Sequence, residues 1–193
     1  MVETTIIFLR HGAVKNDKRI IYGRLPGFPL SELGIEQVKK SAQSLSRYPI
    51  SRIYTSPLLR TGQTAKILSK KLHLQPKISE LLIEVKLIFQ GMPIDEYKKK
   101  IQAHLYDQKY LKKGQESIGQ IERRMLRFVK MIEKRHKNKT VLVVSHGDPI
   151  VILKAVTTGQ KFTWEYKRDN YLITAGWMIL KVVKDKFNWQ NTS

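Results

Sequence analysis

The chain has 193 residues, of which 41% are hydrophobic, and this is enough for one ordinary domain that buries roughly 70% of the surface of the unfolded chain. It contains no cysteine, which excludes disulfides, thiolate-bound metals, iron–sulfur clusters and a cysteine nucleophile. Its 36 lysines and arginines against 16 aspartates and glutamates give a formal net charge of +20. We expect a single domain over residues 1–193 whose last few residues are frayed.

The positive charge is spread along the chain in short runs and is not gathered in one tail. Examples are Lys39-Lys40, Lys70-Lys71, Lys98-Lys99-Lys100 and Arg123-Arg124. A basic balance fits either a nucleic-acid partner or an anionic substrate, but the sequence has no zinc-finger or RNA-recognition pattern. Charge runs of this kind are typical of a solvated surface, so we predict no specific nucleic-acid partner.

Strands and helices alternate along the chain. The continuously apolar runs 5–9 and 140–145 predict strands that are buried on both faces, as in a parallel sheet, and 52–56 predicts a third strand. The apolar part of the first run, Ile6 to Leu9, is far shorter than the about 20 residues of a membrane span. We therefore expect a soluble cytoplasmic protein with no membrane partner.

Helices are predicted between these strands. Apolar residues three and four apart predict helices over 31–48, 57–72, 94–106 and 117–136. Toward the C-terminus, 170–183 predicts one or two more strands, and 187–193 reads as a frayed end. The alternation of strands and helices predicts an α/β layered fold.

Charged side chains follow three of the predicted strands. Arg10 and His11 come directly after the first strand, Arg60 follows the second, and His146 follows the strand over 140–145. Ligands of open α/β sheets bind beyond the carboxyl ends of the strands. We therefore expect these two arginines and two histidines to converge on one site.

The helix starts near these residues favour an anionic ligand. Ser56 is predicted as an N-cap and Pro57 as the first helical residue, which places Arg60 in the first turn. An arginine there adds charge to the positive end of the helix dipole, which is unfavourable unless an anion shares the site. Asp148 opens the helix after His146 in the same way. We infer a phosphate site.

A metal site is the competing interpretation of the same residues. His11 and His146, together with Asp148 and Glu84, offer the nitrogen and oxygen ligands that a divalent cation accepts. The two arginines would repel a cation, and the spacing H-x-x-x-H is absent. We therefore predict no metal and no cofactor.

Four segments carry a resemblance to a known family. They are FLRHG (8–12), YGRLPGFPLSELGIEQ (22–37), YTSPLLRTGQTA (54–65) and VVSHGD (143–148). In this order they resemble the histidine phosphatase superfamily, the phosphoglycerate-mutase-like proteins. The resemblance implies a three-layer α/β/α sandwich with a mostly parallel central sheet. It also implies a phosphohistidine intermediate on His11 and a phosphate pocket of Arg10, Arg60 and His146.

The residue types suit phosphoryl transfer. Guanidinium groups supply paired N–H donors to the charge on a transferring phosphoryl group. A neutral imidazole of His11 can attack phosphorus in line if its other nitrogen donates its proton to a fixed acceptor, for which we expect a backbone carbonyl. A protonated His146 would add a third cation on the phosphoryl group.

The leaving alkoxide needs a proton donor. The resemblance implies a glutamate after the second helix, and LLIEVKLIFQG (81–91) places Glu84 there, with Glu80 as the second candidate. Arginines would lower the pKa of this carboxyl, whereas burial and an approaching phosphate would raise it. We predict the highest activity at mildly acidic to neutral pH.

Five further positions are candidates for substrate contact. Asn16 and Gly147 are predicted to contact the phosphate. A loop that borders the pocket is predicted to contribute to substrate specificity through Tyr22, Gly23 and Arg24. For Arg24, plain solvation of the loop is an equal alternative.

The short chain favours hydrolysis over transfer to a second substrate. Family mutases tend to be longer, with insertions that keep water away from the site, and 193 residues leave little room for them. We predict a phosphomonoesterase of small phosphorylated metabolites, a monomer or homodimer. The alternatives are a phosphoglycerate-mutase-type enzyme and a non-catalytic basic binding module.

Overall fold

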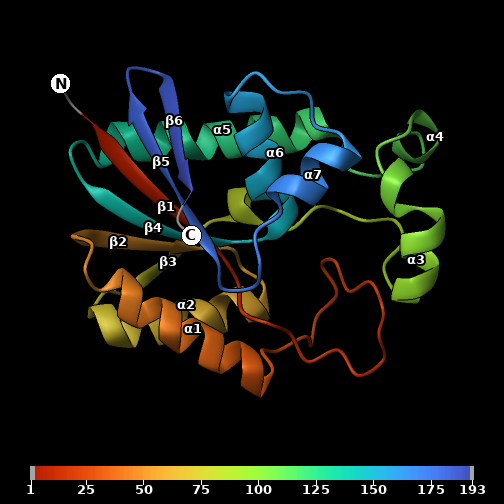
Figure 1. Cartoon of the computed structure of the whole chain (residues 1–193), viewed down its shortest axis with the longest axis horizontal. Helices are drawn as coiled ribbons and strands as arrows, with labels where there is room; N and C mark the ends of the chain where they lie inside the picture. Colours follow the sequence, from red (N-terminus) through yellow and green to blue (C-terminus); the bar gives the residue numbers. More distant parts are fainter. Residues whose placement is uncertain (1–2, 192–193) are drawn as a thin grey trace.

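The computed structural model describes residues 3–191 and contains a six-stranded sheet in the order β3-β2-β4-β1-β5-β6 (Figure 1). The strands are β1 (Thr4–Arg10), β2 (Ile50–Thr55), β3 (Pro76–Ile78), β4 (Thr140–Ser145), β5 (Trp177–Val183) and β6 (Lys186–Asn191). Strands β1 to β4 are parallel, and β5 runs antiparallel to both β1 and β6. The predicted mostly parallel sheet is confirmed.

Helices cover both faces of the sheet (Figure 1). They are α1 (Glu32–Leu45), α2 (Leu59–Leu72), α3 (Ile94–Lys100), α4 (Gln108–Leu111), α5 (Ile118–Arg135), α6 (Gly147–Thr157) and α7 (Trp164–Asn170), with the 3-10 turns η1 (Glu80–Leu82) and η2 (Gln102–His104). Strand β1 shows how the layers form, because its side chains alternate between two cores. Ile7 and Leu9 pack with α1 and α2, whereas Ile6 and Phe8 pack with α5 and α6. The predicted α/β/α sandwich is confirmed.

Two predicted helices match the structure closely because their caps and apolar stripes are strong. Helix α1 begins after Ser31, whose hydroxyl accepts the Gly34 N–H at 3.1 Å. Helix α5 begins after Ser117, which forms a capping box with Gln120. The stripe that α5 buries consists of Ile121, Met125, Phe128, Val129 and Ile132, all without exposed surface.

The predicted helix 94–106 is wrong. Helix α3 ends at Lys100, and the short turn η2 and helix α4 follow it. The backbone leaves helical geometry at Ile101, where φ is −121°, so the chain curls and Tyr97, Ile101 and Leu105 pack on one another. We call residues 87–115 the cap; Figure 1 shows its helices α3 and α4 at the side of the sheet.

The predicted start of the second helix is also wrong. Helix α2 begins at Leu59, and its N-cap residue Leu58 makes no side-chain capping bond. Ser56 is not the N-cap residue of α2, because its hydroxyl is hydrogen bonded to Nε2 of His146 at 2.8 Å. Pro57 therefore precedes the helix and does not form its first residue.

Two predictions near the C-terminus need correction. The segment 170–183 forms a strand only from Trp177 onward, because the chain first completes α7 and a loop. The predicted frayed end 187–193 instead forms β6, in which the Trp189 ring packs on Phe8 with 5.7 Å between ring centroids. Its last two residues lie outside the described residues.

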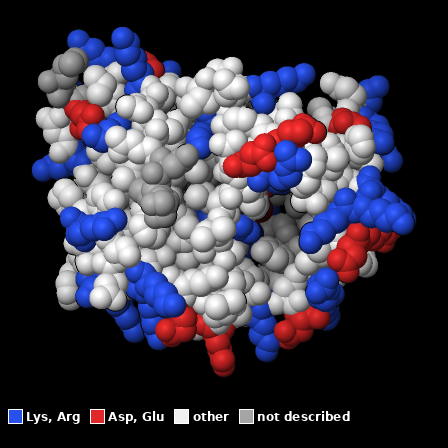
Figure 2. Space-filling model, in the orientation of Figure 1, with Lys and Arg blue, Asp and Glu red and all other residues white. Residues whose placement is uncertain are grey.

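The surface of the molecule is rich in lysine and arginine. Figure 2 shows these side chains scattered over the whole visible face, with fewer acidic ones among them. The same view shows a hollow beside the cap. None of the helices within residues 3–191 is long and apolar enough to cross a membrane.

Candidate active site

A cleft of about 220 Å³ lies where β1 and β4 end, facing the cap. Its inner wall holds Arg10, His11 and Glu84, and the cap contributes Ile94, Tyr97, Lys98 and Gln102. Helix α7 and the loop after it add Lys167 and Tyr171. The cleft is therefore at the carboxyl ends of parallel strands, where the sequence places it.

His11 is held as a neutral imidazole. Its side chain is buried, and Nδ1 lies 2.8 Å from the carbonyl oxygen of Gly12, which confirms the predicted backbone acceptor. Nε2 accepts a hydrogen bond from Nε of Arg60 at 3.2 Å, so the proton is on Nδ1. Burial and the neighbouring Arg60 lower the pKa of His11 to about 3. Nε2 is thus unprotonated over the physiological pH range, and in the free protein its lone pair accepts from Arg60.

Arg60 joins the two histidines of the site. It has only 1% of its surface exposed, and its Nη2 donates to the Gly23 carbonyl at 2.8 Å and to Nδ1 of His146 at 3.2 Å. Its guanidinium lies 4.8 Å from the ring centroid of Tyr22. The left-handed backbone of Gly23, with φ of 43°, presents the carbonyl that Arg60 binds.

His146 is a neutral side chain in the free protein. Because Nδ1 accepts from Arg60, Nε2 carries the proton and donates it to the hydroxyl of Ser56 at 2.8 Å. Burial and Arg60 together lower the pKa of His146 well below its usual value. His146 is therefore not a third permanent cation in the free protein.

Arg10 completes the positive end of the cleft. Its Nη1 donates to the Leu172 carbonyl at 2.7 Å, and its guanidinium lies 4.8 Å from the ring centroid of Tyr171. Its Nε is buried and has no hydrogen-bond acceptor among residues 3–191. An anion beside this guanidinium would improve the balance of charge, because no carboxylate of the described residues forms an ion pair with Arg10.

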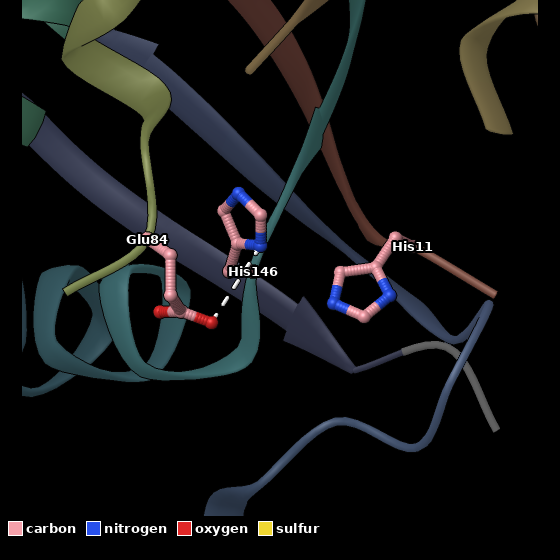
Figure 3. Close-up of side chains that lie close together, drawn as sticks. All are labelled: His11, Glu84 and His146. Atoms are coloured by element: carbon pink, nitrogen blue, oxygen red, sulfur yellow. Dashed lines mark ion pairs between the residues drawn. The ribbon is translucent and has the colours of Figure 1, made fainter. Parts of the chain in front are cut away.

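Glu84 is the carboxyl group of the site (Figure 3). Its Oε2 lies 3.5 Å from Nδ1 of His146 and 3.9 Å from Nη2 of Arg60, while Oε1 accepts the Val85 N–H at 2.9 Å. Burial, and then the charge of Asp148, raise the pKa of Glu84. This favours a protonated carboxyl that can donate. Glu80, the other candidate, is exposed in η1 and does not line the cleft.

An ion pair forms the far wall of the cleft. Nζ of Lys167 lies 2.8 Å from the carboxylate of Asp148, and both side chains are about 10% exposed. Tyr171 packs here against Gly147, where an added Cβ would lie 2.3 Å from the ring. Gly147, predicted as a phosphate contact, therefore serves first to admit this ring. Sequence reasoning missed Lys167 and Tyr171, because a lysine and a tyrosine outside any motif give no signal.

Two other predicted site residues do not line the cleft. The amide of Asn16 is bonded to the backbone N–H and carbonyl of Ile20, at 3.2 and 2.9 Å. The guanidinium of Arg24 binds Glu116 and the carbonyl of Glu84. Of the predicted specificity loop, only Tyr22 and Gly23 reach the cleft.

Three side chains offer a geometry for a metal ion. One ligand atom each of His11, Glu84 and His146 lies within 4.8 Å of the other two. The imidazole nitrogens that face Arg60 already accept its hydrogen bonds, so a cation would sit beside a guanidinium. The guanidinium between these ligand atoms therefore favours an anion over a metal at this end of the cleft.

Fold and site together define a phosphoryl-transfer enzyme: a neutral imidazole lies beside the buried guanidinium of Arg60 and the half-buried one of Arg10 at the carboxyl ends of parallel strands, with a carboxyl group nearby. The family model of the histidine phosphatase superfamily (branch 1) matches residues 6–191. The chain belongs to this superfamily.

Individual relatives agree with this assignment. The chain is 32% identical over 174 residues to phosphoserine phosphatase 1 of Hydrogenobacter thermophilus, covering 86% of this chain and 82% of the relative. Among solved structures, Bacillus stearothermophilus YhfR has a TM-score of 0.85 and 26% identity, with 98% of each chain covered. A mycobacterial glucosyl-3-phosphoglycerate phosphatase shares the fold, with a TM-score of 0.80, 22% identity and coverage of 96% and 95%. The protein is a phosphomonoesterase of this superfamily.

Proposed function

We propose that this phosphomonoesterase works without a metal through a phosphohistidine on His11, with Glu84 as general acid and base. The observation that supports this most strongly is the fixed tautomer of His11, whose Nδ1 is bonded to the Gly12 carbonyl while Nε2 faces Arg60. A phosphoryl group bound at Arg10 and Arg60 meets the lone pair of Nε2.

In the first half of the reaction, Nε2 of His11 forms a bond to phosphorus and the phosphorus–oxygen ester bond breaks. The proton on Oε2 of Glu84 passes to the leaving oxygen, which departs as an alcohol. The guanidinium groups of Arg10 and Arg60 stabilise the charge on the phosphoryl oxygens. His146 is held by Ser56 and Arg60 at the edge of this site.

In the second half, water replaces the alcohol. The Glu84 carboxylate accepts a proton from this water as its oxygen attacks phosphorus, and the nitrogen–phosphorus bond breaks. Inorganic phosphate leaves, His11 regains its neutral ring, and Glu84 regains its proton. No step needs a redox partner or a second substrate.

The substrate is proposed to be a small alkyl phosphate. The relative from Hydrogenobacter thermophilus is named a phosphoserine phosphatase, which makes O-phosphoserine the first ester to test. The outer cleft offers a paired carboxylate and ammonium in Asp148 and Lys167, and the ammonium of Lys98 from the cap. Groups of both signs are what an amino acid ester would bind.

The test is to trap the intermediate. The protein, treated with a chelator, is mixed with radiolabelled phosphate ester and quenched in base, because phosphohistidine survives base and is lost in acid. We expect label on the wild type and none on His11→Ala, whose rate of phosphate release should fall by at least about 10³-fold. A wild type that hydrolyses ester without ever carrying acid-labile label would refute the proposal.

The same assay separates the alternatives. A mutase-type enzyme would produce an isomerised ester in place of free phosphate, and both products can be followed by phosphorus NMR. A basic binding module would show salt-sensitive binding to nucleic acid with no turnover.

A further inference from the structure

The segment that carries Glu84 is held along its backbone by side chains from other parts of the chain. Nη1 of Arg124 donates to the Leu81 carbonyl at 2.9 Å. The hydroxyl of Ser145 donates to the Leu82 carbonyl at 2.8 Å. Nε of Arg24 donates to the carbonyl of Glu84 itself at 2.6 Å.

Glu116 links the two arginines that hold this segment. Its carboxylate accepts from Nη2 of Arg24 at 3.0 Å and from Nε of Arg124 at 2.8 Å. It also accepts the backbone N–H of Lys86 at 2.9 Å. The Glu116 and Arg124 side chains are only 11% and 13% exposed, so water screens these bonds weakly.

The side-chain bonds of the network reach the reacting atoms through Glu84, while the carbonyl of Gly23, the residue before Arg24, binds Arg60. Neither Glu116 nor either arginine lines the cleft. Oε1 of Glu84 is bonded to the N–H of the next residue, Val85, so the carboxyl group turns with the backbone. A small tilt of that backbone therefore moves Oε2 away from the leaving oxygen, and shifts of about 1 Å cost up to about 10²-fold in rate.

We propose that Glu116, together with Arg24 and Arg124, positions Glu84 to protonate the leaving group. The inference rests on the acid role given to Glu84 in the proposed function. It also gives Arg24 a different role from the substrate contact that the sequence predicts. Arg24 is a positioning residue that acts on the acid and not on the substrate.

The chemistry of the leaving group distinguishes positioning from a merely structural role. An alkoxide needs a proton as it departs, whereas p-nitrophenolate is stable enough to leave without one. A misplaced acid therefore slows the hydrolysis of O-phosphoserine more than that of p-nitrophenyl phosphate. A general loss of folding or of phosphate binding slows both esters by the same factor.

The experiment compares kcat/KM for these two esters in the full chain. The variants are Glu116→Gln, which replaces the carboxylate by an amide of nearly the same shape, and Arg24→Gln, which leaves Glu116 paired with Arg124. The matched control is Arg123→Gln, an exposed arginine beside Arg124 on α5. The constant kcat/KM is used because it reports the steps up to the departure of the leaving group.

We expect the ratio of kcat/KM for O-phosphoserine to that for p-nitrophenyl phosphate to fall about tenfold in both variants, and to stay unchanged in Arg123→Gln. If circular dichroism shows that Glu116→Gln does not fold, the ratio measured for Arg24→Gln alone tests the inference. An unchanged ratio, or an equal loss on both esters, would overturn the inference.

A parallel Glu84→Gln variant separates the two levels of the proposal. If Glu84→Gln lowers the ratio and the network variants do not, the positioning role fails while the acid role stands. If Glu84→Gln leaves the ratio unchanged, the acid role fails and the inference falls with it. Loss of trapped phosphoryl label in His11→Ala tests the phosphohistidine independently of both.

Discussion

The inner and outer walls of the cleft are built in different ways. The inner wall holds Arg10, His11 and Glu84, and behind it lie Arg60 at the start of α2 and His146 after β4, which like His11 are at most 2% exposed. The outer wall comes from the cap, whose small cluster contains the buried side chains Tyr97, Ile101 and Leu105. The inner wall is anchored in the main sheet, whereas the outer wall rests on a few local contacts.

This difference separates chemistry from substrate choice. The reacting groups are bonded to one another and to backbone groups of the loops around them, as in the contacts of Arg60 with both histidines and with the Gly23 carbonyl. A change there should affect every substrate. The cap side chains Ile94 and Lys98 line the cleft opposite the reacting groups, so a change there should affect substrates selectively.

Apart from the nucleophile His11, the largest effect is expected at Arg60. Replacing it by glutamine removes its charge and its hydrogen bonds to His11 and His146, and should lower kcat about 10² to 10³-fold on every ester. Steady-state kinetics on O-phosphoserine and p-nitrophenyl phosphate measures this. The control is Lys66→Gln, an exposed cation on the same helix. If Arg60→Gln and Lys66→Gln lost kcat to a comparable extent, the inner wall would be no more important for catalysis than the exposed surface.

The pH dependence tests the electrostatics of the inner wall. His11 must be deprotonated to attack, and its pKa of about 3 keeps it so down to acidic pH. Glu84 must be protonated, so kcat/KM falls as pH rises through its pKa, which burial and Asp148 raise. Asp148→Asn should move this basic limb to lower pH. Above the limb, kcat/KM should fall about tenfold for each pH unit by which the limb moves.

Profiles of the wild type and of Asp148→Asn, recorded on one ester, provide the measurement. Ionisation of the substrate contributes equally to both, so only the difference between the profiles counts. A basic limb that stays in place, or a wild-type rate that still climbs above pH 9, would contradict the acid role of Glu84.

A smaller effect is expected in the cap. Leu105→Ala removes a buried side chain from its cluster and should loosen α3, which carries Tyr97 and Lys98. We expect KM for O-phosphoserine to rise about threefold to tenfold, with kcat for p-nitrophenyl phosphate nearly unchanged.

The matched variant is Leu142→Ala in β4, which lies in the main core without exposed surface. It should lower the free energy of unfolding of the whole chain by about 2–5 kcal/mol, measured by urea denaturation. If Leu105→Ala lowered global stability as much and left KM unchanged, the cap would not be the independent wall described above.

The difference between the inner wall and the cap also determines which features the sequence can predict. Residues Arg10, His11, Arg60 and His146 were predicted to converge because parallel strands end at one edge of a sheet, and the structure brings them together. The starts of the predicted helices 31–48 and 117–136 also agree with α1 and α5, where the capping serines Ser31 and Ser117 give strong local signals. These features depend on short-range patterns combined with one rule of topology.

The features that were missed depend on partners far away in the sequence. Ser56 reads as a helix cap, but His146, ninety residues away, takes its hydroxyl. The apolar spacing of Tyr97, Ile101 and Leu105 is helical, yet the helix ends before Ile101, and the three side chains pack on one another. Residues 186–191 form β6, in which the Trp189 ring packs on the distant Phe8. Neighbouring residues give no sign of such contacts.

The base of the cap is closed by its own bonds. The N–H of Glu116 donates to the Lys86 carbonyl at 3.2 Å, and the N–H of Lys86 donates to the Glu116 carboxylate at 2.9 Å. The two ends of the cap therefore meet at one point, and the cost of closing a longer or shorter excursion grows only slowly with its length. The cap is also bonded to the loop over 19–24, as in the bond from the Ile21 N–H to the Met92 carbonyl at 2.8 Å, so exchanging both segments together offers a route to give one phosphoryl chemistry a new choice of alcohol.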